Sequence, residues 1–154
     1  MQEWPVVHIY TDGSYKGASR CGGYAAVMVC GPYQQIVYGA EANTTNNRME
    51  LSAVLCALNR LNTRCKVTVI SDSEYVVKGM TQYIGNWVRN NWRNANRVLI
   101  MNQDLWRQIY EHCQYHSITG HWVKGHANDE TNNLCDWFAQ NACDLIGRPT
   151  PAAE

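Results

Sequence analysis

The stretch VVHIYTDG, residues 6–13, is an apolar and β-branched run that ends in an acidic residue and a glycine. Such a run predicts a strand that stops at Asp12 and Gly13. Two more strand patterns follow, at residues 22–30 and 33–40. The sequence therefore begins with three strands that are expected to run antiparallel.

Helical and strand patterns alternate in the rest of the chain. Apolar residues recur at helical spacing from residue 47 to residue 61, and residues 66–71 follow as a β-branched strand. The remaining patterns are helices after Ser73 and at 102–113, a short strand at 117–123 and an amphipathic helix at 129–146. This order predicts an α/β fold with a five-stranded mixed sheet, three antiparallel strands and then two parallel ones, flanked by helices.

The chain has 154 residues, of which 45% are hydrophobic, which suffices for one core and is too short for two ordinary domains. We therefore expect a single domain over residues 1–148 and a disordered tail over residues 149–154. The 13 basic and 13 acidic residues cancel. The net charge thus neither predicts nor excludes a polyanionic partner, and the distribution of charge along the chain must decide.

Seven cysteines form an odd set without a C-x-x-C pair, which fits neither a disulfide framework nor a common zinc spacing. Reduced and mostly buried thiols are expected. A zinc site would have to mix a helix end with a strand, using His112, Cys113, His116 and His121. Neither a secretion signal nor a run of about 18 apolar residues is present, which predicts a cytoplasmic protein without a membrane partner.

Four carboxylates each have an ordinary explanation when taken singly. Asp12 could belong to a turn, and Asp72 could cap the helix that follows it. Glu50 lies three residues after Asn47, which is the spacing of a capping box. Asp136 could simply be a solvated residue of the last helix.

The predicted fold, however, can bring these four carboxylates together. Asp12 and Asp72 end two strands expected to be neighbours, Glu50 lies in the first turn of a helix, and Asp136 lies on a helix that can pack over the sheet. Four such groups would repel one another unless divalent cations held them, and carboxylate oxygens suit Mg²⁺ or Mn²⁺. Two ions about 4 Å apart are a known arrangement for phosphodiester hydrolysis, so the cluster predicts a two-metal hydrolase site.

Five blocks of sequence carry a resemblance to a known family. They are TDGS at residues 11–14, TTNNRMEL at 44–51, SDSEYV at 71–76, WVKGH at 122–126 and NxLCD at 132–136. In this order and spacing, the chain resembles a type 1 ribonuclease H over about residues 7–142. The resemblance implies a ribonuclease H-like fold and an endonuclease that hydrolyses the RNA strand of RNA–DNA hybrids, leaving 5′-phosphate and 3′-hydroxyl ends.

The resemblance also implies roles for individual residues. The metal-binding catalytic carboxylates would be Asp12, Glu50, Asp72 and Asp136, holding two Mg²⁺ ions, or Mn²⁺ as a substitute, with substrate bound. His126, on a loop of small residues, would assist proton transfer or product release. Thr45 would lie near a DNA phosphate, and Asn46 and Asn47 would read 2′-hydroxyls and base edges in the minor groove, although helix capping is the alternative for these two asparagines.

Residues 75–103, here called the basic segment, carry a charge of +4 from lysine and arginine and contain no acidic residue. Basic residues interleaved with aromatic ones suit a phosphate backbone. The resemblance implies that this segment grips the DNA strand, with Trp87, Arg89, Trp92 and Arg93 as contacts, whereas a solvated pair of helices held by tryptophans would look similar. Its few lysines predict modest affinity with a shallow salt dependence.

Two positions depart from the family pattern. The segment around Ala18 lacks an asparagine that contacts nucleic acid, and Lys16 or Arg20 would supply only a charge in its place. Glu74 stands where glutamine is common, and it would either repel phosphate or pair outward with Lys78.

Two other functions remain open at this point. One is a binding module that recognises hybrids without cutting them, and the other is a DNA-cutting nuclease of the same superfamily, such as an integrase, transposase or junction resolvase. The protein is expected to be a monomer.

Overall fold

Five strands form one mixed sheet in the order β3-β2-β1-β4-β5, as the computed structural model of residues 3–125 and 129–147 shows. The strands are β1 (Val6–Lys16), β2 (Cys21–Cys30), β3 (Tyr33–Ala42), β4 (Lys66–Ser71) and β5 (Ser117–Trp122). The β1–β2 and β2–β3 pairs are antiparallel, and the β1–β4 and β4–β5 pairs are parallel. The predicted fold class is therefore confirmed.

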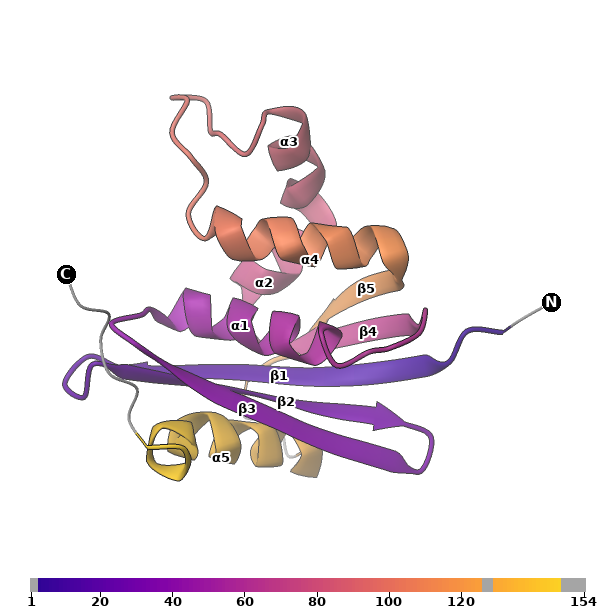
Figure 1. Ribbon diagram of the computed structural model, residues 1–154, viewed down its shortest axis with the longest axis vertical. Coiled ribbons are helices and arrows are strands. Elements are labelled where there is room, and N and C mark those ends of the chain that lie inside the picture. Colours follow the sequence, from indigo (N-terminus) through magenta and orange to yellow (C-terminus); the bar gives the residue numbers. More distant parts are fainter. Residues whose placement is uncertain (1–2, 126–128, 148–154) are drawn as a thin grey trace.

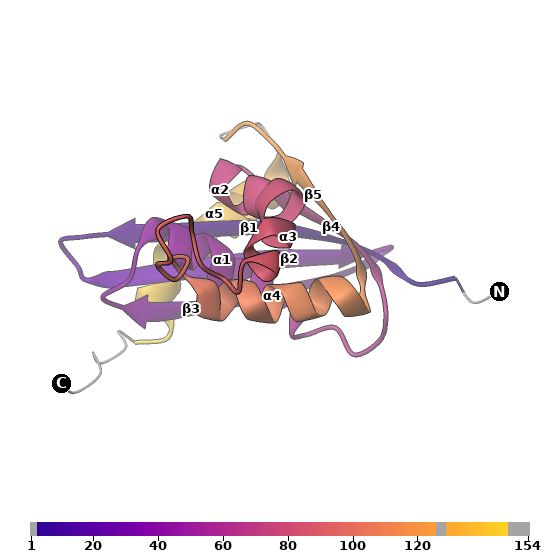
Figure 2. The ribbon, with the colours of Figure 1, turned by 90° about the horizontal axis from the view of Figure 1, so that it is seen from above.

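The helices cover both faces of the sheet. They are α1 (Asn46–Leu58), α2 (Glu74–Lys78), the π-helical turn η1 (Gly79–Tyr83), α3 (Ile84–Arg89), α4 (Gln103–Tyr115) and α5 (Glu130–Leu145). Helix α1 lies on one face of the sheet, and α2, α3 and α4 form a part that projects from this same face. Among the described residues, α5 is the one helix on the opposite face (Figure 1, Figure 2). None of the helices in the described ranges has the length and apolar character needed to span a bilayer.

Alternate residues of β1 and β2 face two unequal cores. Ile9 and Ala26 belong to a large core with α1 and α4, in which Leu51 and Trp106 are fully buried. Ala25, Val27, Cys135 and Ala139 form a much smaller core between the sheet and α5. Helix α5 is therefore attached through far fewer buried side chains than α1.

The prediction that the first strand stops at Asp12 and Gly13 is wrong. Strand β1 continues to Lys16, and Asp12 and Gly13 pair with Ala25 and Tyr24 of β2 as interior strand residues. An Asp-Gly pair is typical of turns, but here Gly13 serves a close approach between β1 and a helix, as described below.

The prediction that all seven cysteines are reduced is also wrong, because Cys21 and Cys143 form a disulfide. Strand β2 and the end of α5 bring the two Cα atoms to 6.4 Å although 122 residues separate them in sequence. Tertiary packing alone creates this pair, so spacing in the sequence could not reveal it. The other five cysteines are free, with Cys65 and Cys135 buried.

Candidate metal centre

The site lies where β1 and β4 separate. The two strands pair in parallel from Val6 with Lys66 to Tyr10 with Ile70. Asp12 and Asp72 each lie two residues beyond this last pair, so the register of the sheet sets them opposite each other across the split. The prediction placed Asp12 and Asp72 at the ends of neighbouring strands. Asp72 does follow the last residue of β4, whereas Asp12 lies inside β1, just beyond the point where β1 stops pairing with β4.

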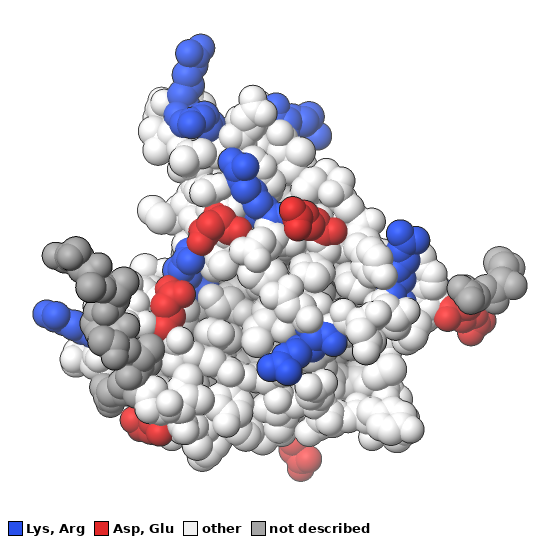
Figure 3. All heavy atoms as spheres, viewed as in Figure 1, with Lys and Arg blue, Asp and Glu red and all other residues white. Residues whose placement is uncertain are grey.

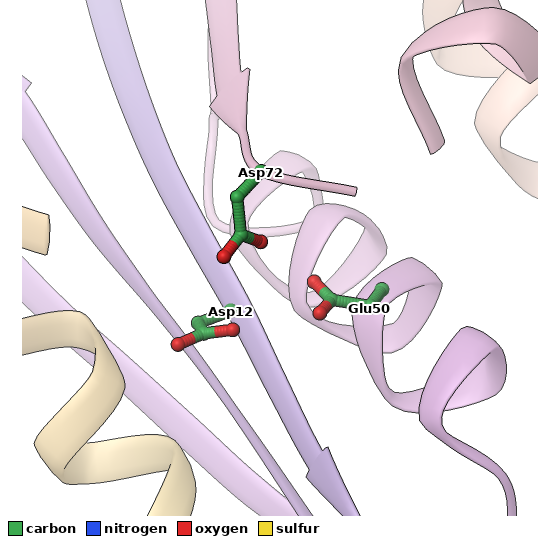
Figure 4. A group of neighbouring side chains, drawn as sticks. All are labelled: Asp12, Glu50 and Asp72. Atoms are coloured by element: carbon green, nitrogen blue, oxygen red, sulfur yellow. The ribbon is translucent and has the colours of Figure 1, made fainter. Parts of the chain in front are cut away.

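Glu50 reaches the split from α1 because Gly13 lets the helix approach the sheet. A Cβ atom on Gly13 would lie 2.5 Å from the backbone nitrogen of Glu50, so only glycine fits without a shift of the backbone. The capping-box explanation of Glu50 fails, since Thr45 caps α1 by accepting a hydrogen bond from the Arg48 amide at 3.1 Å. The Glu50 side chain instead points toward Asp12 and Asp72 (Figure 4), and the residue is 9% exposed.

Asp136 reaches the split from the opposite face of the sheet. At Gly23 an added Cβ would lie 2.1 Å from the carbonyl oxygen of Ala139, so α5 packs closely on β2. The buried Cys135 thiol donates to the carbonyl oxygens of Tyr10 and Ala25, at 3.4 and 3.2 Å. Asp136, half-buried, follows directly and lines one cavity together with Asp12 and Asp72.

The four carboxylates therefore converge, with Asp12 in the middle. One carboxylate oxygen from each of Asp12, Glu50 and Asp72 lies within 4.8 Å of the others (Figure 4). The side chain of Asp136 is within hydrogen-bonding reach of Asp12. The structure thus brings together all four carboxylates expected from the sequence.

Burial and mutual repulsion oppose the charged forms of the inner two carboxylates. Burial raises the pKa of Asp12 to about 8, together with its hydrogen bond to Asp136 and repulsion by Asp72, against the lowering effect of the Gly13 amide at 2.9 Å. Burial, followed by repulsion from Asp12 and Asp72, raises the pKa of Glu50 to about 9. A cation bound among them would relieve this repulsion.

The donor set fits a divalent cation. Glu50 Oε2 is buried and has no hydrogen-bond partner among the described residues, which leaves an oxygen unused by the protein itself. Several carboxylate oxygens and no sulfur or imidazole donor in the group match the preference of hard cations.

Asp72 does not cap α2, although the sequence alone allowed that role. Ser73 caps α2 instead, because its hydroxyl accepts from the Val76 amide at 3.2 Å. The Trp122 indole donates to the Asp72 carbonyl oxygen at 3.0 Å. This hydrogen bond connects the last residue of β5 to the residue that follows β4. The exposed Asp72 carboxylate is therefore available to the cluster.

The cavity beside Asp12 has four polar lining residues that the sequence did not single out as site residues. They are Thr11, Lys124, Asn132 and Asn133. All four lie in the TDGS, WVKGH and NxLCD blocks, so the signal for them was present. His126 and the expected tail at residues 149–154 lie outside the described residues.

The residues expected to contact nucleic acid near α1 are exposed, as that expectation requires. Thr45, Asn46 and Asn47 all lie at the start of this helix. Thr45, and neither asparagine, provides the cap. Asn46 Oδ1 accepts from the Tyr15 amide at 2.8 Å, which fixes the amide plane and leaves its NH₂ group to donate elsewhere.

The basic segment combines exposed arginines with tryptophan rings that pack in the protein. Arg89 and Arg93 are exposed, and Figure 3 shows Lys and Arg side chains on the projecting part that carries α3 in Figure 1. Trp92 is only 8% exposed, and Trp87 packs on Trp106 with ring centroids 5.1 Å apart. These rings are thus packed as the alternative of helices held by tryptophans expects. Arg89 and Arg93 donate to the Asn86 side chain and to the Arg97 carbonyl oxygen, which are neutral acceptors, so their exposed positive charges remain for an anion.

The sheet order and the acidic cluster at the β1–β4 split define a protein of the ribonuclease H-like fold class. Residues 5–144 match the family model described as RNase H. The chain is 44% identical over 144 residues to the ribonuclease H of Chromohalobacter salexigens, covering 94% of this chain and 88% of that one. It is 40% identical over 144 residues to the ribonuclease H of Pelobacter propionicus, covering 93% and 88%.

A solved structure agrees with this assignment. LC9-RNase H1, described as a type 1 RNase H with the type 2 active-site motif, superposes with a TM-score of 0.83 at 28% identity, covering 94% of this chain and 75% of that one. The chain belongs to the RNase H family. Membership makes it an enzyme of the ribonuclease H class, and the predicted resemblance is confirmed.

Proposed function

We propose that the protein is an endonuclease that hydrolyses the RNA strand of RNA–DNA hybrids and leaves 5′-phosphate and 3′-hydroxyl ends. The observation that carries this proposal is the convergence of Asp12, Glu50, Asp72 and Asp136 at one split in the sheet. Membership of the RNase H family supports the choice of substrate.

The carboxylates would hold Mg²⁺, or Mn²⁺ as a substitute, with two ions present when substrate is bound. Such ions activate a water for attack and stabilise charge on the leaving oxygen. Asp12, which has an oxygen within 4.8 Å of Glu50 and Asp72 and lies within hydrogen-bonding reach of Asp136, would be the central ligand. His126 would accept or deliver a proton during the reaction or assist product release.

Substrate contacts would come from two surfaces. The exposed Thr45, Asn46 and Asn47 offer hydroxyl and amide groups suited to 2′-hydroxyls, base edges and a phosphate. Arg89 and Arg93 offer charge to the DNA backbone. Trp87 and Trp92 would act chiefly by holding these arginines in place, since their rings are packed in the protein.

The oligomeric state, the domain bounds and the cellular location also stay predictions. All four carboxylates come from one chain, which supports action as a monomer. One sheet with helices on both faces supports a single domain over residues 1–148. A cytoplasmic location remains the expectation from the sequence.

One assay tests the function. Labelled RNA–DNA hybrid, double-stranded RNA and double-stranded DNA are each incubated with the protein, with and without Mg²⁺ or Mn²⁺. We expect metal-dependent cleavage of the RNA in the hybrid alone, and loss of that cleavage in Asp12→Asn, which removes a ligand charge at nearly constant size. Binding without products would indicate a module without catalysis, and equal cutting of DNA duplex would indicate a DNA nuclease.

A further inference from the structure

The carboxylate of Asp136 has a partner on its own helix. Gln140 lies one turn further along α5, and its Nε2 is 3.1 Å from both Oδ1 and Oδ2 of Asp136. Side chains four residues apart share one face of a helix, so this contact needs no distortion of α5. Gln140 itself is exposed, which means that core packing does not explain its conformation.

The backbone that carries Gln140 is fixed on the sheet. Its neighbour Ala139 is buried and packs on Gly23 of β2, and Cys143 is bonded to Cys21 less than one turn further on. The backbone at Gln140 is therefore held in a fixed position, and the fold determines that the side-chain amide can contact Asp136.

A restraint on Asp136 has a physical purpose at this place. The terminal torsion of an aspartate is broad, so its carboxylate plane is poorly defined without a hydrogen-bond partner. Asp136 is also only half-buried, and it reaches Asp12 from the α5 face, where the core is small. An amide that donates to both oxygens limits rotation of the carboxylate.

The neutral charge of the glutamine is equally relevant. A lysine or arginine in this place would also donate, but its positive charge would compete with a cation for the same carboxylate. The amide of Gln140 orients Asp136 and leaves its full negative charge for the metal. Ligand carboxylates commonly have such outer hydrogen bonds, and loss of one typically lowers metal affinity or activity about 10–100-fold.

We infer that Gln140 is a positioning residue that holds the Asp136 carboxylate in the orientation needed to bind a divalent cation. This inference rests on the proposed role of the cluster as a metal centre. It assigns Gln140 no contact with substrate, so its effect should appear in metal binding rather than in hybrid binding.

The test compares Gln140→Met, which keeps side-chain length and helix propensity but removes the donor, with a matched control. The control is Asn141→Ala, because Asn141 also donates to a group four residues earlier, the Trp137 carbonyl oxygen at 2.8 Å, but to no carboxylate. Mn²⁺ binding to the substrate-free protein is measured by calorimetry. Mg²⁺ dependence of hybrid cleavage and KM for hybrid at saturating Mg²⁺ are measured beside it.

We expect Gln140→Met to raise the dissociation constant for Mn²⁺ and the half-saturating Mg²⁺ concentration by about tenfold, with KM for hybrid unchanged. Asn141→Ala should match the wild type. In an Asp136→Asn background, Gln140→Met should have no further effect on Mn²⁺ binding, since the two residues act as a unit.

Three results would overturn the inference: wild-type Mn²⁺ affinity in Gln140→Met, an equal loss in Asn141→Ala, or additive effects in the double variant. A Gln140-dependent Mn²⁺ site in a wild-type protein that cleaves no hybrid would support the inference and overturn the proposed function instead.

Discussion

The two helices that complete the acidic cluster are attached to the sheet in different ways. Helix α1 carries Glu50 within the large core, where Leu51, Val54 and Leu58 are fully buried. Helix α5 carries Asp136 over the small core, and the disulfide adds a covalent bond on that side. We call these the α1 side and the α5 side of the site.

The difference shows that the carboxylates of one site can be held in place in two ways, by extensive core packing or by a few contacts and a disulfide. The position of Glu50 follows from the same packing that holds the whole domain together, and Arg48 near it adds ion pairs to Glu41 at 2.9 Å and to Asp104 at 2.7 Å. The position of Asp136 depends on a few close contacts and one bond. Disturbance of the α5 side should therefore affect metal binding before it unfolds the rest.

The largest expected effect is on the α5 side, from loss of the disulfide. Cys21→Ala with Cys143→Ala should lower the free energy of unfolding by about 4 kcal/mol, because a bond closing so long a loop restricts the unfolded chain most. The melting temperature should fall by about 10 °C. Scanning calorimetry with and without reductant measures this.

The double variant contains its own control. Reductant should destabilise the wild type and leave the variant unchanged, and the unfolded wild type should expose five thiols before reduction and seven after it. Seven thiols without reductant would contradict the disulfide.

The next effect is on the α1 side, at Gly13. Gly13→Ala places a methyl group 2.5 Å from the Glu50 amide nitrogen, so α1 must move away from β1. We expect a loss of about 3 kcal/mol in chemical denaturation and a strong fall in hybrid cleavage. Gly17→Ala is the matched control, since nothing lies within 4 Å of its added Cβ. Equal stability of the two variants would show that α1 does not need this close approach.

Glu50, on the α1 side, also predicts that the stability of the metal-free protein depends on pH. The pKa of Glu50 is raised to about 9 in the folded protein from 4.5, so the folded state holds a proton that the unfolded state releases between these values. Metal-free stability should therefore fall as pH rises from about 5 to about 9. Mg²⁺ should oppose this fall by binding the deprotonated form.

Glu50→Gln isolates this effect. Its amide does not titrate and can donate to Asp12, so the variant should be more stable than the wild type at pH 9 by about 2 kcal/mol without metal, and nearly equal to it at pH 5. Thermal melts at both pH values measure the difference. A wild-type advantage at pH 9 would mean that repulsion at Glu50 is unimportant.

The sequence predicted the strands, the helices and the four carboxylates because these follow from local periodicity and from the expectation that Asp12 and Asp72 lie on neighbouring strands. Local patterns were misleading where a long-range contact decided the structure. The Asp12-Gly13 pair resembled a turn, yet Gly13 serves packing against α1. Glu50 resembled a capping residue, yet Thr45 caps that helix.

The other differences have the same origin. The disulfide joins residues 122 apart, and no spacing rule predicts such a pair. Tryptophans beside arginines suggested that the rings contact the DNA strand, yet Trp92 is buried against Tyr110 with ring centroids 6.2 Å apart. The contact of Gln140 with Asp136 is local, and a carboxylate with an amide four residues later on one helix could have indicated it.

The smallest effect is expected at Glu74, which belongs to neither side of the site. Its carboxylate pairs with Lys78 at 3.2 Å, and both side chains are largely exposed, at 63% and 48%. The sequence left open whether Glu74 repels the substrate or points outward, and the structure shows the outward pair. Glu74→Gln should therefore change kcat/KM for hybrid little and cost only about 0.3 kcal/mol of stability, the usual value of such a helix pair. A clear rise in kcat/KM at low salt would instead show that the negative charge of Glu74 near Asp72 weakens substrate binding. The activity of the site would then depend on the end of β4 as well as on the α1 side and the α5 side.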